Sequence, residues 1–113
     1  MATSDRIKLI HLFGKLIQYA YENNIDFIIT TFYRTAEEQN KLYKEGKSKC
    51  DGYKVKSRHQ LWRAVDVAVL RDGNIIWEGD EYTRLGEYWE SLGGTWGGSW
   101  AAFGGGDVYH LEV

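Results

Sequence analysis

Residues 57–70 have the sequence SRHQLWRAVDVAVL, and this stretch decides the fold that we expect. After Ala64 every second residue is a valine, up to Val69, which is the period of a strand buried on one face. Asp66 stands between the valines, with Ala64 and Ala68 as its neighbours on the other face. The sequence therefore predicts a strand from Ala64 to Leu70 that carries a carboxylate between two small side chains, with room for an ion.

A histidine upstream of this strand is a second candidate ligand. His59 lies seven residues before Asp66, and on one continuous helix the two would be about 10 Å apart along the axis, given a rise of about 1.5 Å per residue. One metal ion would not bridge that distance comfortably. A bend through residues 60–63, followed by the strand, can instead bring both side chains to a single zinc ion.

The C-terminal segment repeats this arrangement. Val108–Val113 is expected to form a last strand, with His110 and Glu112 on its more polar face. Asp107 is an odd number of residues from His110, so a regular strand would aim the two side chains in opposite directions. The glycines at 104–106 can turn the chain before the strand begins, so that both side chains reach one site.

The other segments complete an α+β pattern in a single domain over residues 1–113. The expected helices are Ser4 to about Glu22, a capping box at Thr35 leading to Gly46, and Asp80 to Leu92. The expected strands are Asp26–Tyr33 and Asn74–Trp77, the second closing a hairpin at Asp72-Gly73.

The first helix is expected to bury one apolar stripe, because apolar side chains recur in it at helical spacing. That stripe consists of Ile7, Ile10, Phe13, Ile17 and Tyr21.

The composition excludes several classes of function. A net charge of −2, with acids among the basic residues, disfavours nucleic-acid binding. The single cysteine, Cys50, forms no internal disulfide, and no apolar run is long enough for membrane insertion. Met1–Asp5 has no signal-peptide pattern, so we expect synthesis in the cytoplasm.

The candidate residues suit zinc-dependent hydrolysis. Two imidazoles and one carboxylate leave a fourth position for water, as catalytic zinc requires and structural zinc does not. A nearby carboxylate can then take the proton of the water, and a cation can stabilise the oxyanion. Asp107 suits the first role, and Arg34, at a strand-to-helix junction, suits the second.

A resemblance to a known family covers most of the chain. The pattern Ser57-x-His59-x(4)-Ala64-x-Asp66 with Asp107-x-x-His110 resembles the zinc peptidases that include VanY-like and VanX-like D-Ala-D-Ala peptidases and phage L-alanyl-D-glutamate endolysins. The resemblance extends to further residues, namely Phe32-Tyr33-Arg34-Thr35, Gln39, Leu42, Tyr43, Gly46 and Trp96-Gly97-Gly98.

The resemblance implies a role for each matched position. His59, Asp66 and His110 would bind Zn2+, Asp107 would be the general base, and Arg34 would stabilise the transition state. Three further matched residues would contact substrate: Ser57, Gln39 and Trp96. For Trp96, however, a place in the protein core is the favoured interpretation, as is usual for tryptophan.

The implied fold, like that of hedgehog and the D-Ala-D-Ala peptidases, has a central antiparallel sheet with helices packed mainly on one side. The implied partner is the peptidoglycan stem peptide, cut by a monomer that reaches the cell wall through holin-type release.

Two departures from the family pattern affect specificity. Trp62 stands where the family often has glycine, in the loop next to the first ligand. The base position holds Asp107 where the D-Ala-D-Ala dipeptidases have glutamate, which favours an L-alanyl-D-glutamate endopeptidase over a D-Ala-D-Ala carboxypeptidase.

The same histidines would also suit two other functions, a cysteine peptidase and a non-catalytic binding module. Cys50 paired with His59 or His110 would make a cysteine peptidase, although its polar surroundings indicate an exposed loop. A non-catalytic, zinc-stabilised wall-binding module would need the ligands alone. The presence of both Asp107 and Arg34 argues against that module.

Overall fold

The computed structural model describes residues 3–100 and 106–113 and has an α+β fold, as the sequence predicts. Its elements in chain order are α1 (Thr3–Glu22), β1 (Asp26–Thr31), α2 (Ala36–Lys44), β2 (Ala64–Arg71), β3 (Asn74–Ile76), α3 (Asp80–Ser91), β4 (Thr95–Trp96), the 3-10 helix η1 (Gly97–Ser99) and β5 (His110–Glu112).

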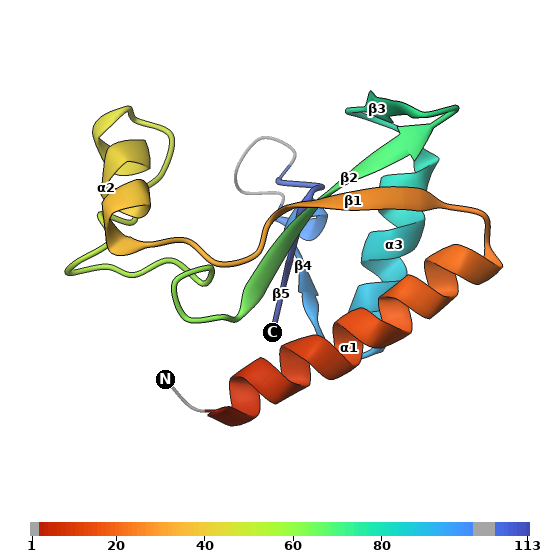
Figure 1. Cartoon of the computed structure of the whole chain (residues 1–113), viewed down its shortest axis with the longest axis horizontal. Coiled ribbons are helices and arrows are strands. Elements are labelled where there is room, and N and C mark those ends of the chain that lie inside the picture. Colours follow the sequence, from red (N-terminus) through yellow and green to blue (C-terminus); the bar gives the residue numbers. More distant parts are fainter. Residues whose placement is uncertain (1–2, 101–105) are drawn as a thin grey trace.

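The sheet is antiparallel and is built around β2 (Figure 1). Along one edge β2 pairs with β1, and along the other it pairs with β5 through residues 64–66 and with β3 through residues 69–71. The short strand β4 pairs with β5 at the far side. Because β2 has neighbours on both edges, its position and register are fixed by the rest of the sheet.

One face of the sheet carries the core, and α1 and α3 supply most of the rest of it. The three valines of β2 are all buried there, as their alternation predicts. Trp89 of α3 is fully buried, and its indole N–H donates a hydrogen bond of 2.9 Å to the carbonyl of Glu112, which ties α3 to β5. The helix α2 stands apart from this layer, at the end of the molecule where residues 45–63 form a long loop (Figure 1).

The prediction of which face of α1 is buried is wrong for four of its five residues. The buried side chains are Leu9, Leu12, Phe13, Leu16 and Ala20. The exposed ones are Ile7, Ile10, Ile17 and Tyr21. Both sets recur at helical spacing, so periodicity alone does not choose between them. The exposed residues Ile17 and Tyr21 border an apolar groove of about 460 Å³ between α1 and β1.

The last strand is shorter than predicted. It begins at His110 because a turn precedes it, in which the His110 N–H donates to the Asp107 carbonyl at 3.2 Å. Of the three glycines expected to turn the chain, Gly104 and Gly105 lie outside the described residues. β4 was not predicted, because two residues among glycines carry no strand pattern.

The local signals of α2 and of the hairpin are confirmed. Thr35 and Glu38 form a reciprocal capping box, with hydrogen bonds of 3.0 and 3.1 Å. Asp72 and Gly73 both have positive φ, as the tight turn between β2 and β3 requires. Among the helices of the described ranges, none combines the length and the apolarity needed to cross a membrane.

The bend that leads into β2 contains a strained residue. Trp62 has a φ of 56°, in the left-handed region that favours glycine. Its ring compensates by stacking on Tyr33, with centroids 4.7 Å apart, and by lying 4.5 Å from the Arg6 guanidinium carbon. This backbone conformation gives a physical reason why glycine suits the position in the resembling family.

Replacing Trp62 should separate these two effects. Trp62→Ala and Trp62→Gly both remove the ring contacts, but only alanine keeps the left-handed strain. We expect Trp62→Gly to be more stable than Trp62→Ala by about 1 kcal/mol in urea unfolding.

Leu61 is the matched control, because its φ is not positive. At that position the order should reverse, with alanine more stable than glycine. If alanine were also the more stable replacement at Trp62, the backbone strain would play no part.

Candidate metal centre

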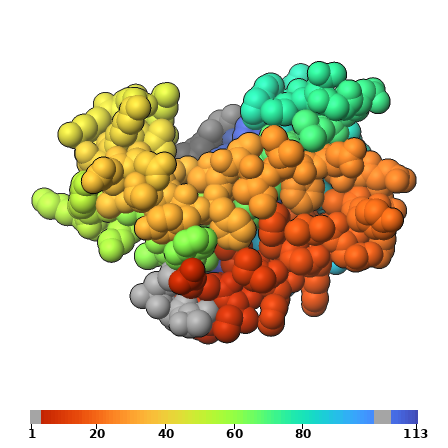
Figure 2. Space-filling view, viewed as in Figure 1, coloured from red at the N-terminus to blue at the C-terminus, as the bar shows by residue number. Residues whose placement is uncertain are grey.

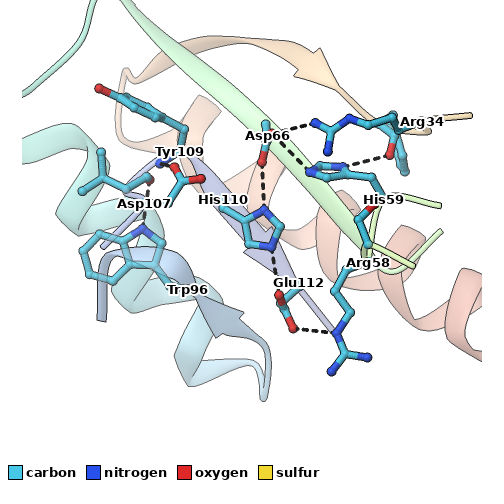
Figure 3. A network of polar contacts seen from close by, with 12 residues as sticks. Arg34, Arg58, His59, Asp66, Trp96, Asp107, Tyr109, His110 and Glu112 are labelled. Atoms are coloured by element: carbon cyan, nitrogen blue, oxygen red, sulfur yellow. Dashed lines mark hydrogen bonds and ion pairs between the residues drawn. The ribbon is translucent and has the colours of Figure 1, made fainter. Parts of the chain in front are cut away.

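Three side chains from separate parts of the chain meet beside β2 (Figure 3). His59 comes from the loop after α2, Asp66 lies on β2, and His110 is the first residue of β5. His110 is paired directly with Asp66 in the sheet register. One ligand atom from each residue lies within 4.8 Å of the others. The structure thus brings together the three residues that the sequence predicts as ligands.

The tautomer of His59 is set by the backbone. Its Nδ1 lies 3.2 Å from the Phe32 carbonyl, which can only accept, so this nitrogen carries a proton and donates it. Its Nε2 is then left facing Asp66 Oδ2, at 3.2 Å. A histidine held through one ring nitrogen in this way presents the other to a metal ion.

The second histidine is held by a carboxylate. His110 Nδ1 lies 3.0 Å from Asp66 Oδ1, and its Nε2 lies 2.9 Å from Glu112 Oε1. Glu112 in turn pairs with Arg58, whose Nε is 3.2 Å from Oε2 (Figure 3). Glu112 therefore occupies the ring nitrogen that faces away from Asp66, which leaves Nδ1 as the ligand atom.

Asp66 and His110 form an ion pair in the metal-free protein. Burial by itself would raise the pKa of Asp66, but hydrogen bonds from His110 and His59 outweigh burial and lower the pKa to about 2. Burial would lower the pKa of His110, but hydrogen bonds to Asp66 and Glu112 raise it to about 9. A metal ion that takes the Nδ1 position must therefore displace a proton.

The donor set fits a catalytic zinc ion. Two imidazole nitrogens and one carboxylate oxygen are ligands that zinc accepts, and three protein ligands leave one position open. His59 and His110 are each held at the nitrogen that does not face Asp66, which is the arrangement that metal-binding histidines require.

Asp107 lies in the same cleft as the ligands. The turn at residues 107–110 brings its carboxylate to the same side as His110, and the Tyr109 N–H donates to Oδ1 at 3.1 Å. The residue as a whole is exposed, yet burial of the carboxylate raises its pKa, and the negative charge of Asp66 raises it further. Asp107 is thus a carboxylate with increased basicity beside the candidate metal position.

Arg34 lies on the opposite side of the cleft from Asp107 (Figure 3). Its Nη2 is 4.0 Å from Asp66 Oδ2, and its Nη1 donates a hydrogen bond of 2.9 Å to Gln39 Oε1. The side chain is therefore anchored at one nitrogen and faces the metal cluster with the other.

The cleft has a volume of about 610 Å³. Besides the ligands, Arg34 and Asp107, it is lined by Leu42, Lys47, Ser48, Cys50, Lys56, Ser57, Arg58, Trp100 and Glu112. Ser57 thus lies where a substrate contact was predicted. Cys50 lies in the cleft rather than in a fully exposed loop. Among the described residues, however, no hydrogen bond joins its thiol to either histidine.

Two predicted substrate contacts are placed elsewhere. Gln39 is fully buried, and its amide group donates to Ser48 Oγ and the Cys50 carbonyl at 2.8 and 2.9 Å. It holds Arg34 and the loop together instead of facing the cleft. Trp96 belongs to the core, with its indole N–H donating to the Val108 carbonyl at 3.0 Å.

Sequence reasoning missed two groups of the site. The Phe32 carbonyl has no sequence signal, because any residue there would offer the same group. Arg58 stands next to a predicted ligand, and its charge was the available signal that it could pair with Glu112.

A His-Asp-His cluster with a basic carboxylate and an arginine in one cleft is the arrangement of a metal-assisted hydrolase. The chain belongs to the peptidase family described as D-alanyl-D-alanine carboxypeptidase, whose sequence pattern matches residues 51–113. The matched stretch contains all three candidate ligands and Asp107.

One relative and two solved structures add to this. The peptidoglycan L-alanyl-D-glutamate endopeptidase CwlK of Bacillus subtilis is 32% identical over 109 residues, which cover 83% of this chain and 64% of CwlK. The L-Ala D-Glu endopeptidase ChiX of Serratia marcescens superimposes with a TM-score of 0.72 at 24% identity, over 99% of this chain and 80% of ChiX.

The vancomycin-resistance D,D-pentapeptidase VanY, solved with Zn(II), superimposes with a TM-score of 0.64 at 20% identity, over 94% of this chain and 70% of VanY. The two structures share the fold of this chain, and the predicted fold class and family resemblance are confirmed.

Metal binding should release a proton. Zn2+ added to the metal-free protein at pH 7 should bind at about one ion per chain and release about one proton, since His110 is charged before binding and neutral afterwards. Calorimetry in buffers of different ionisation enthalpy measures both quantities.

His59→Ala, Asp66→Ala and His110→Ala should each bind Zn2+ weakly. His110→Ala should in addition lose the proton release. His11, an exposed histidine of α1, gives the control variant His11→Ala, which should behave as wild type. Tight binding that persists in all three ligand variants would remove the assignment.

Glu112 should matter through His110. Glu112→Gln keeps the shape of the side chain but loses its charge, so we expect Zn2+ affinity to fall roughly tenfold in competition with a chelator. Glu87→Gln, an exposed site on α3, should leave the affinity unchanged. An affinity within twofold of wild type in both variants would show that Glu112 does not orient the ligand.

Proposed function

We propose that this chain is a zinc-dependent peptidase that hydrolyses the L-alanyl-D-glutamate bond of peptidoglycan stem peptides. The observation that carries the proposal is the placement of Asp107, a basic carboxylate, in one cleft with a complete His-Asp-His ligand set. The choice of this bond is supported by the relative CwlK, whose name refers to it, as does the name of the structural neighbour ChiX.

Each group of the cleft has a chemical task in this proposal. Zinc, when bound, would supply Lewis-acid activation of water and of the scissile carbonyl. Asp107 would accept a proton from the attacking water and pass it to the leaving amine, which its raised pKa favours. Arg34 would donate to the oxygen that becomes negative as the carbonyl is attacked.

The position of Arg34 is prepared before substrate arrives. Gln39 Oε1 fixes one end of the guanidinium, and the buried amide of Gln39 is fixed in turn by Ser48 and Cys50. A donor that is held in place in the free protein needs no reorganisation during the reaction. Ser57, buried in the cleft wall, would contact the peptide next to the ligands.

The shape of the cleft supports an endopeptidase. Beyond Lys47, Ser48 and Trp100 it continues into a second hollow of about 440 Å³, which also borders Asp107. A peptide can therefore extend past the metal cluster instead of ending there. The D-Ala-D-Ala carboxypeptidase alternative keeps the support of the family description.

Digestion of purified peptidoglycan tests both the bond and the mechanism. Wild-type protein with zinc should release new amino termini on D-glutamate, seen by mass spectrometry, and chelation should abolish this release until zinc is restored. Asp107→Asn should bind Zn2+ normally yet lose roughly 10²-fold or more in turnover, the scale of a positioned acid-base group.

The same assay separates the alternatives. Cys50→Ser should keep most of the activity, and its loss with folding and zinc intact would favour the thiol mechanism. Release of D-alanine would identify a carboxypeptidase. Binding to wall fragments without new amino termini, equal in wild type and Asp107→Asn, would identify a non-catalytic module.

A further inference from the structure

The charge of the chain is unevenly distributed. Residues 41–58 hold seven of the 14 basic residues and only two of the 16 acidic residues, although the whole chain has a net charge of −2. The remainder of the chain is therefore strongly acidic. In Figure 2 this basic segment belongs to the yellow and yellow-green lobe at one end of the molecule.

The basic segment forms one wall of the candidate active-site cleft. Lys47, Lys56 and Arg58 line the cleft together with the metal cluster, and Lys47 and Lys49 border the adjoining hollow. We call residues 41–58 the cationic wall. No feature of the proposed catalytic mechanism requires lysines at these positions.

The wall is held in a defined conformation by hydrogen bonds. The Asp51 carboxylate turns into its own loop and accepts three backbone N–H groups, at 2.8 to 3.0 Å. Gln60 and Asn40 donate to the carbonyls of Gly52 and Asp51, each at 2.9 Å. Asp51 is therefore engaged within the loop and does not pair with the lysines of the cleft.

The lysines are the cations of the cleft that its own carboxylates leave free. Arg34 faces Asp66, and Arg58 pairs with Glu112. Lys56 makes no ion pair with any residue in the described ranges, and Lys47 pairs only with Glu45, at an exposed position where such a contact contributes little. Two ammonium groups are thus available to a ligand.

We propose that the cationic wall binds a free carboxylate of the substrate, namely the α-carboxylate of the D-glutamate next to the scissile bond, through Lys47 and Lys56. This inference rests on the proposed function. In a stem peptide D-glutamate continues the chain through its γ-carboxyl group, so its α-carboxylate stays charged unless it is amidated. Three carboxylates line the cleft, at Asp66, Asp107 and Glu112, and the two arginines of the cleft already face Asp66 and Glu112, so the lysines are the cations left to attract this anion.

A peptide carboxylate fits the observations better than an anionic wall polymer. Lys47 and Lys56 line the cleft together with the metal cluster, where a short acidic peptide would be held, whereas a phosphate polymer needs cations along an extended outer face.

Two synthetic peptides that differ only in this charge test the proposal. They are N-acetyl-L-Ala-γ-D-Glu-L-Lys and its α-amide, which contains D-isoglutamine. The zinc-loaded wild-type protein should prefer the acid roughly fivefold in kcat/KM, mainly through KM, as expected for partly exposed ion pairs. Raising the salt concentration from about 0.05 to 0.5 M should reduce the preference.

The double variant Lys47→Gln/Lys56→Gln should use acid and amide with equal kcat/KM. Lys15→Gln, an exposed lysine of α1, should keep the full preference. Equal use of both peptides by wild type, or an unchanged preference in the double variant, would overturn the proposal.

The experiment distinguishes an error in the proposed scissile bond from an error in the carboxylate proposal. If neither peptide is cut, dissociation constants of the intact peptides still decide: tighter binding of the acid by wild type alone supports the wall, and equal binding overturns it. If the double variant instead loses only its binding to walls that carry teichoic acid, the cationic wall binds a phosphate polymer and the carboxylate proposal is wrong.

Discussion

The contact between Asp66 on β2 and His110 on β5 is the one on which the rest of the site depends. The two residues face each other in the sheet register, and a slip of one residue would turn Asp66 into the core and a valine into the cleft. The slip is prevented because the valines of β2 pack against α1 and α3, and because the Trp89 indole holds β5 by its backbone. The geometry of the metal cluster is thus a consequence of how the core packs on the opposite face.

Placing these groups below the surface has an electrostatic cost that the site offsets locally. An isolated buried carboxylate would take up a proton, but Asp66 has His59, His110 and Arg34 around it and stays ionised. His110 keeps its proton for the same reason, between Asp66 and Glu112. A divalent ion replaces that proton with more charge at the same place. In the metal-free protein the ligands are therefore held in position, with the His110 proton at the place of the metal ion. Metal binding is coupled to pH because it displaces this proton.

The sequence predicts those features that local chemistry determines. The alternating valines define β2 and aim Asp66 at the cleft, and the Thr35 capping box defines the start of α2. Prediction from the sequence fails where tertiary packing selects among equivalent patterns, as in α1, where Leu9, Leu12 and Leu16 are buried instead of the isoleucines. Gln39 matches a family pattern that says nothing about where its amide points, and Trp96 is buried because α3 has Gly86 there. A Cβ at Gly86 would lie only 2.0 Å from the Trp96 ring.

The two sides of the cleft are built differently, and one buried amide connects them. Asp66 and His110 stand on the sheet, whereas the cationic wall consists of the last turn of α2 and the loop that follows it. Gln39 bridges the two parts, since it accepts from Arg34 and donates to Ser48 and Cys50. Removal of this amide would take one hydrogen-bond partner each from Arg34, Ser48 and the Cys50 carbonyl at once, which costs more than the loss of one exposed contact. The orientation of Arg34 and the position of the wall are therefore coupled, although the wall's exposed lysines can change without disturbing the sheet that holds the metal ligands.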